Sequence, residues 1–257
     1  MNTSYKLIAL QTIVIKEVRR FLRIWVQTLV PPVITIAWYF VIFGNLIGSR
    51  IGNMGGYSYM EFIVPGLIMM AVVNNSYANV VSSFFGQKFQ RSVEELLVSP
   101  VPNHIILIGF VAGGVARGFA VGFIASVISL FFSGLHMHNL LVTVLVVLLS
   151  SVVFSLGGFI NAVFARNFDD ISIIPTFILT PLIYLGGVFY SVQLLPDTWR
   201  IVSQFNPIFY MINAFRYGVL GVSDISVSYA FAILLLFTAV LFAISMYLLR
   251  RGKGLRH

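Results

Sequence analysis

The sequence predicts an all-α polytopic membrane protein with six transmembrane helices. Hydrophobic residues make up 59% of the 257 residues and charged residues only 9%, against roughly 45–50% and 25% in soluble domains. The apolar residues form continuous runs, whereas the strands of a transmembrane barrel alternate in polarity. Lysines and arginines gather between alternate runs, as the positive-inside rule requires of a helical membrane protein.

Residues 1–24 are predicted to form an amphipathic helix on the inner membrane surface. Apolar side chains recur there at helical spacing: Leu7, Leu10, Val14, Val18, Phe21, Leu22 and Trp25. Charged side chains occupy the other face: Lys16, Glu17, Arg19, Arg20 and Arg23. Such a helix buries its apolar face in the headgroup region and turns its basic residues toward anionic lipid. Glu17 is expected on the same polar face.

Six apolar runs provide the roughly 20 residues that cross a bilayer core as a helix. They are residues 25–47, 62–85, 105–132, 140–164, 171–190 and 228–249. If the N-terminus is inside, the inner segments contain 12 of the 16 lysines and arginines, Lys253 and Arg256 among them. This bias predicts that both termini are cytoplasmic.

A short charged helix is predicted between the second and third spans, in residues 86–104. Its apolar stripe consists of Phe89, Val93, Leu96 and Leu97. Its remaining surface is formed by Lys88, Gln90, Arg91, Glu94 and Glu95. Ser92 and Glu95 match a capping box, and Pro100 and Pro102 end the helix. The pattern alone is equally compatible with a solvated loop helix that has no partner.

Residues 191–227 are predicted to form a re-entrant pair of outer helices before the last span. The stretch 201–221 is too apolar for a watery loop, yet Asn206-Pro207 and Arg216 argue against a lipid-exposed span. The candidate outer gate consists of Asn206, Pro207, Phe209, Tyr210, Phe215 and Arg216. Its aromatic rings could close an outer exit or stack on a sugar, but core packing and lipid contact are the default expectation. A peripheral amphipathic helix is the alternative for this segment.

Polar groups near the middle of the second and third spans mark a candidate transport pathway or helix contact. They are Asn74, Asn75, Tyr77 and Arg117. Polar groups at this depth usually face protein or water. We expect Arg117 to bond to Asn74, Asn75 or a carbonyl where Gly113, Gly114 and Gly118 allow close approach. A structural contact and contact with an anionic substrate both remain open.

Two segments carry a resemblance to a known family. VEELLVSPVPNHIILIG, residues 93–109, and LTPLIYLGGVFYSVQLLPDTWRIVSQFNPIFYMINAFRYGVLG, residues 179–221, occur in this order among six predicted spans. They resemble the two signatures of ABC-2 type permeases, the membrane subunits of one class of ATP-binding-cassette exporters. The resemblance covers essentially the whole chain and implies a single transmembrane domain, residues 1–257, in a bacterial inner membrane.

The resemblance also implies partners and roles. Such permeases work as dimers, and each copy binds a separate cytosolic ATPase subunit, so two ATPase copies are expected beside a second copy of this chain. Residues 86–104 correspond to the coupling helix, and the amphipathic first helix resembles the elbow helix. The residues implied to contact the ATPase are Phe89, Arg91, Glu94, Glu95 and Leu96. Family members export drugs, lipid-linked molecules and polysaccharides.

The chain is not expected to be an enzyme by itself. It has no G-x-x-x-x-G-K-[ST] phosphate-binding loop, so ATP and Mg²⁺ would be used by the partner subunit. We expect no catalytic residues, no metal site and no cofactor in this chain, and no nucleic-acid partner. Its basic residues are explained by the inner membrane surface.

An ion-coupled secondary carrier, which needs no ATPase, is the alternative function. Such a carrier requires acidic residues within its spans for proton or cation coupling. The acidic residues here all lie at span boundaries or in loops: Glu17, Glu61, Glu94, Glu95, Asp169, Asp170, Asp197 and Asp224. This distribution favours the permease.

Overall fold

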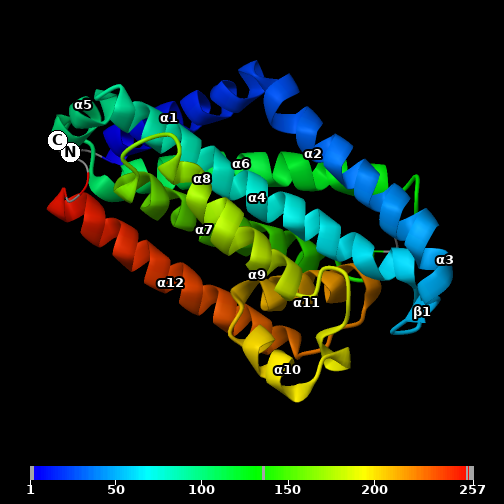
Figure 1. Ribbon diagram of the computed structural model, residues 1–257. Helices are drawn as coiled ribbons and strands as arrows, with labels where there is room; N and C mark the ends of the chain where they lie inside the picture. Colours follow the sequence, from blue (N-terminus) through cyan, green and yellow to red (C-terminus); the bar gives the residue numbers. More distant parts are fainter. Residues whose placement is uncertain (1–2, 135–136, 253, 255–257) are drawn as a thin grey trace.

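The chain folds into a bundle of helices (Figure 1). The computed structural model describes residues 3–134, 137–252 and 254. Among these residues, five helices are long and apolar enough to cross a membrane. They are α2 (Trp25–Tyr39) with its π-helical continuation η1 (Phe40–Ile47), α4 (Tyr59–Phe89), α6 (Asn103–Ser129), α7 (Leu140–Phe164) and α12 (Val227–Arg251). Five of the six predicted spans are therefore present as long helices.

The fifth predicted span, residues 171–190, is shorter than expected. Helix α8 (Asp170–Ile174), π-helical η2 (Pro175–Leu179) and α9 (Thr180–Leu185) follow one another without a break. Together they extend for about 24 Å at 1.5 Å per residue, less than the ~30 Å of a bilayer core. The helix stops because the chain turns at Gly187, where φ is +82°. The prediction that it reaches residue 190 is wrong.

The two ends of the bundle carry different elements (Figure 1). The short helix α5 (Ser92–Val98), the first turns of α1 (Thr3–Arg23) and the last turns of α12 gather at one end. At the other end lie α3 (Gly48–Ile51) and the hairpin of β1 (Asn53–Met54) and β2 (Tyr57–Ser58). Residues 1 and 2 of the predicted first helix, and Lys253 and Arg256 of the charge count, lie outside the described residues.

Helix α4 is the centre of the bundle, packed mainly against α6 and α7. Its first turn is held by a capping box: the Ser58 hydroxyl accepts from the N–H of Glu61, and the Glu61 carboxylate accepts from the N–H of Ser58 at 3.0 Å. Gly114 of α6 permits close packing, because a Cβ there would lie 3.0 Å from the Ser76 carbonyl and nearer still to the Ser155 hydroxyl. The predicted close approach at the α6 glycines is confirmed.

The segment before the last span contains three short helices: η3 (Val192–Leu194), α10 (Asp197–Gln204) and α11 (Pro207–Leu220). The predicted break between two helices falls at Asn206, whose side chain caps α11 by accepting from the N–H of Ile208 at 3.0 Å. Helix α11 is buried among α4, α7 and α12, and α10 is mostly exposed. The peripheral alternative therefore describes α10 but not α11.

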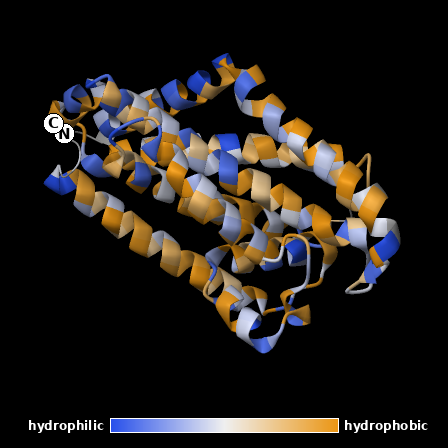
Figure 2. Cartoon of the chain, in the orientation of Figure 1, coloured by the Kyte–Doolittle hydropathy of each residue, from blue (hydrophilic) through white to orange (hydrophobic). Residues whose placement is uncertain are grey.

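Helices α2 and α12 form the largely exposed flanks of the bundle. Figure 2 shows hydrophobic residues along most of α12, with hydrophilic residues at its C-terminal end. On α2, exposed apolar side chains include Trp25, Val26, Ile34 and Trp38. In water such surfaces would be unfavourable, so these flanks are suited to lipid or to another protein copy.

The predicted helix α1 is present, but the predicted position of one of its side chains, Glu17, is wrong. Glu17 does not lie on an exposed polar face: it is fully buried where α1 packs against α6, and its carboxylate reaches Ser83 of α4. A Cβ at Gly113 of α6 would lie 2.5 Å from the Glu17 Cβ, so the absence of a side chain at Gly113 makes room for the glutamate. Leu7 and Leu22 remain exposed on α1, as an interfacial helix would require.

Candidate functional site

The junction between α4 and α5 makes a sharp turn at one residue. Arg91 has a left-handed backbone with φ of +60°, the one such non-glycine residue in the described part of the chain. Helical structure restarts at Ser92, the first residue of α5, as predicted. The predicted capping box between Ser92 and Glu95 does not form. Ser92 is the first residue inside the helix, and its hydroxyl donates to the carbonyl of Gln87 at 3.2 Å.

Helix α5 has one anchored face and one free face. Val93 is 1% exposed, and Leu96 and Leu97 pack partly against the core. Glu94 and Glu95 are exposed on the other face, next to Arg91. The predicted apolar stripe is therefore correct for α5 itself, and its charges are free to meet a partner.

Phe89 does not belong to the buried stripe, because it ends α4 instead of lying on α5. Its side chain is 61% exposed. The ring lies 6.2 Å from Phe85 and 5.1 Å from Phe168, centroid to centroid. An exposed aromatic cluster thus borders α5. We call Phe89, Phe168 and Val98, together with the exposed charges of α5, the α5 surface.

Lys88 is buried, although the sequence pattern places it on the charged surface of this segment. Its Nζ atom donates to the carbonyls of Val163 and Ala165 at 2.6 and 2.7 Å. These carbonyls are at the C-terminal end of α7, where a cation satisfies free acceptors and the helix dipole. Lys88 therefore ties the last turn of α4 to the end of α7, and α5 starts from a fixed point.

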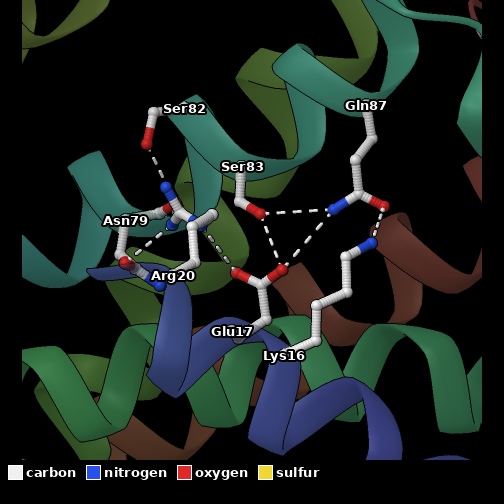
Figure 3. Close-up of polar contacts among 7 residues, drawn as sticks. All are labelled: Lys16, Glu17, Arg20, Asn79, Ser82, Ser83 and Gln87. Carbon is white, nitrogen blue, oxygen red and sulfur yellow. Dashed lines mark hydrogen bonds and ion pairs between the residues drawn. The ribbon is translucent and has the colours of Figure 1, made fainter. Parts of the chain in front are cut away.

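A polar ridge runs along α4 at intervals of four residues: Asn75, Asn79, Ser83 and Gln87. This spacing puts all four on one helix face. Figure 3 shows three of them, Asn79, Ser83 and Gln87, facing the side chains of α1. Sequence reasoning missed this ridge, but its regular spacing is a signal that could have revealed it.

Glu17 is the centre of the contact between α1 and the ridge. Its Oε1 atom accepts from the Ser83 hydroxyl at 2.7 Å and from Gln87 Nε2 at 3.5 Å, and its Oε2 atom lies 3.4 Å from Arg20 Nε (Figure 3). Arg20 Nη2 also donates to Asn79 Oδ1 and to its carbonyl, both at 2.8 Å. The buried carboxylate is thus satisfied by a charge and by neutral donors, as burial requires.

Arg117 joins the deep end of the same ridge. Its Nη2 atom donates to Asn75 Oδ1 at 2.9 Å and to the Thr28 carbonyl at 3.3 Å. The predicted hydrogen bond between Arg117 and Asn75 is present. Both residues, with Asn74, line a cleft of about 310 Å³ between α2, α4 and α6. Tyr77 is not part of it, since its buried ring lies beside Gly157 of α7.

The candidate outer gate residues lie in the core. Asn206, Phe209, Tyr210 and Phe215 are buried, and Pro207 begins α11. Arg216 is 1% exposed; it donates to the Gly187 carbonyl at 2.7 Å and stacks 4.0 Å above the Phe62 ring. Arg216 also lines a polar cavity of about 290 Å³ with Asp224 and Ser191. Core packing accounts for the contacts of these rings.

Comparison with known proteins identifies the class. A model of the ABC-2 type transporter family matches residues 8–220, so the chain belongs to this family. The chain is 59% identical, over 97% of each chain, to the inner membrane transport permease YadH of Escherichia coli strain K12. It is 25% identical, over 81% of each chain, to nodulation protein J of Rhizobium leguminosarum bv. viciae. The family match extends from α1 to α11 and therefore includes α5, the ridge and the cleft.

Proposed function

We propose that this chain is the permease subunit of an ATP-driven exporter in the bacterial inner membrane. Two copies would form the pathway, and each would bind one copy of a separate cytosolic ATPase subunit. The ATPase uses ATP and Mg²⁺, and the permease binds no cofactor of its own. Support comes from the membership of the ABC-2 family and from the similarity to YadH, an inner membrane transport permease.

The observation that carries the coupling role is the construction of α5. The helix is short and is fixed at its base by Val93 and by the buried amine of Lys88. Its free face presents Arg91, Glu94 and Glu95, and Phe89 adds an exposed ring. Because α5 is fixed at its base, a displacement caused by a docked ATPase is transmitted to α4 and α7 and is not lost in local deformation of α5. The charges set the register of docking.

The exposed side of α2 is proposed to face the second copy across the pathway. An aromatic cluster links α2 and η1 to the shorter helix α9: Tyr39, Phe43, Tyr184 and Phe189. The hydroxyls of Tyr39 and Tyr184 are 3.1 Å apart and exposed. Polar and aromatic groups on an otherwise apolar membrane surface suit a protein-lined route better than lipid contact.

Affinity purification in mild detergent tests this function. The variant carrying Glu94→Lys and Glu95→Lys is expected to retain at least about tenfold less ATPase than the unchanged chain, because it reverses two charges on the free face of α5. The matched control is Asp197→Lys, an exposed acidic residue of α10 that lies away from α5. Quantitative ATPase retention by the double variant contradicts the coupling role.

The ion-coupled carrier remains the second candidate because Glu17 is a buried carboxylate. Against it, the oxygens of Glu17 are already occupied by Arg20, Ser83 and Gln87. Reconstituted vesicles separate the two functions. The exporter requires the ATPase and ATP for transport, whereas the carrier moves cargo with an ion gradient alone.

A further inference from the structure

Arg117 is a membrane-helix cation for which the described residues supply no carboxylate partner. Its two hydrogen bonds go to neutral oxygens, on Asn75 and Thr28. Its Nε atom is buried without a hydrogen-bond partner. The charged side chain whose field acts on it is Arg20, which has the same sign. Among the described residues, Arg117 therefore has no negative partner. A charge left without a partner at this depth is costly, so the site favours a negatively charged ligand.

Arg216 is the matched comparison within the same chain. It is fully buried, whereas Arg117 is only partly buried, and the Nε atom of Arg216 also lacks a hydrogen-bond partner. However, the carboxylate of Asp224 acts on it with the opposite charge, and the Phe62 ring covers its guanidinium. The fold therefore provides a counter-charge for the buried Arg216, and the described residues provide none for the partly buried Arg117.

The cleft beside Arg117 is built for a small polar group with apolar attachments. One part of its lining is apolar: Pro31, Pro32, Ile36, Met70, Ala71 and Ala78. The rest is polar: Gln27, Thr35, Asn74, Asn75 and Arg117. Its volume of about 310 Å³ is at the lower end of ligand pockets, roughly 300–1,000 Å³. It accommodates a headgroup, and hydrocarbon chains can extend along the exposed flank of α2.

A basic groove precedes this cleft on α1. It is a hollow of about 370 Å³ lined by Lys16, Arg19, Arg20, Arg23 and Ile24. Arg20 connects the two hollows, because it bonds to Asn79, and Asn75 one turn further along α4 bonds to Arg117. Glu17 offsets one of the four positive charges, so the groove keeps a net positive charge. Such clusters attract anionic headgroups at a membrane surface.

We propose that the cleft binds the anionic headgroup of an amphiphile, which reaches Arg117 from the inner leaflet by way of the basic groove. The inference rests on the proposed transport function, in which the bound headgroup belongs to the cargo. Arg117 supplies the charge-assisted hydrogen bonds through the part of its guanidinium that lines the cleft. The basic groove raises the local headgroup concentration and the rate of entry.

Binding of a short-chain lipid to the full-length chain tests the proposal without any ATPase. The probe is dioctanoyl phosphatidic acid in a neutral detergent, compared with dioctanoylglycerol, which lacks the phosphate, and with inorganic phosphate. The unchanged chain is expected to bind the phosphatidic acid at least about tenfold more tightly than the diacylglycerol. Arg117→Gln is expected to abolish that difference, and Arg117→Lys to keep part of it. The matched control, Arg50→Gln, changes an exposed arginine of α3 and should bind as the unchanged chain does.

Each other outcome overturns the proposal. If Arg117→Gln binds phosphatidic acid normally, Arg117 is a structural contact only. If inorganic phosphate displaces the lipid at equal concentration, the site takes free anions and not amphiphiles. Should Arg117→Gln fail to fold, the comparison of the two lipids on the unchanged chain decides, and equal affinities refute the inference. These readouts are independent of ATPase retention, so either proposal can fail while the other stands.

Discussion

At the scale of single residues, two buried charges, Glu17 and Lys88, tie helices together at the end of the bundle that carries α5. Glu17 joins α1 to α4, and Lys88 joins the end of α4 to the end of α7. Their partners are distant in sequence: Ser83 is 66 residues from Glu17, and Val163 is 75 residues from Lys88. The sequence pattern puts both on polar surfaces because local periodicity contains no information about such long-range pairs.

Replacing Glu17 with alanine is expected to destabilise the contact between α1 and α4. The change leaves Ser83 without its acceptor and Arg20 without its carboxylate, which should lower the free energy of unfolding by about 2–3 kcal/mol. Denaturation of the purified chain in mild detergent measures this loss. Glu94→Ala removes an exposed carboxylate and is the control, with an expected change within about 0.5 kcal/mol. Equal stability of the two variants would argue against a structural role for Glu17.

At the scale of elements, the direction of α5 depends on the left-handed backbone of Arg91. A left-handed conformation costs an ordinary residue about 1–2 kcal/mol, and glycine adopts it freely. The turn that separates α4 from α5 therefore depends on the backbone conformation of Arg91. This turn sets the direction in which the charged side chains of α5 point.

Two substitutions of Arg91 separate its charge from its backbone. Arg91→Gly removes the guanidinium and keeps the turn, whereas Arg91→Val removes the guanidinium and disfavours the turn. We expect Arg91→Val to retain severalfold less ATPase in co-purification than Arg91→Gly. If both variants retain the same amount, the backbone conformation of Arg91 does not contribute to coupling, and its charge alone would account for any loss.

Long apolar helices were the most predictable elements. Helix α7 begins at Leu140 and ends at Phe164, as the sequence predicts, because Asn139 caps its start and the apolar run stops before Arg166. The prediction extends the shorter helix beyond its end at Leu185. Gly186-Gly187 interrupts an apolar run that hydropathy alone treats as continuous. Among the site residues, the bond between Arg117 and Asn75 is predictable from their similar depth, and core packing is the default expectation for the gate rings. The full burial of Arg216 is not predictable from the local pattern.

At the scale of the whole molecule, the elements at the two ends of the bundle lead to a prediction of which end faces the cytoplasm. The bundle places α5 at one end and the short helix η3, which contains Leu194, toward the other. The chain has no cysteine, so single cysteines can be introduced without background. In intact cells, a membrane-impermeant maleimide is expected to label Leu194→Cys and to label Val98→Cys only after permeabilisation. Both side chains are well exposed. Labelling of both from the same side would refute the orientation with cytoplasmic termini.

The short helix from Asp170 to Leu185 has a consequence for the surrounding lipid. Its ~24 Å cannot match a hydrocarbon layer of ~30 Å. Coil follows the helix, and Val188 of that coil is buried against Gly66 of α4. Backbone outside a helix is tolerated at such depth only where protein or water satisfies it. Where this helix lies in the membrane, we therefore expect the bilayer to be thinner beside it than elsewhere, which shortens the distance that a lipid-like molecule travels between the two faces.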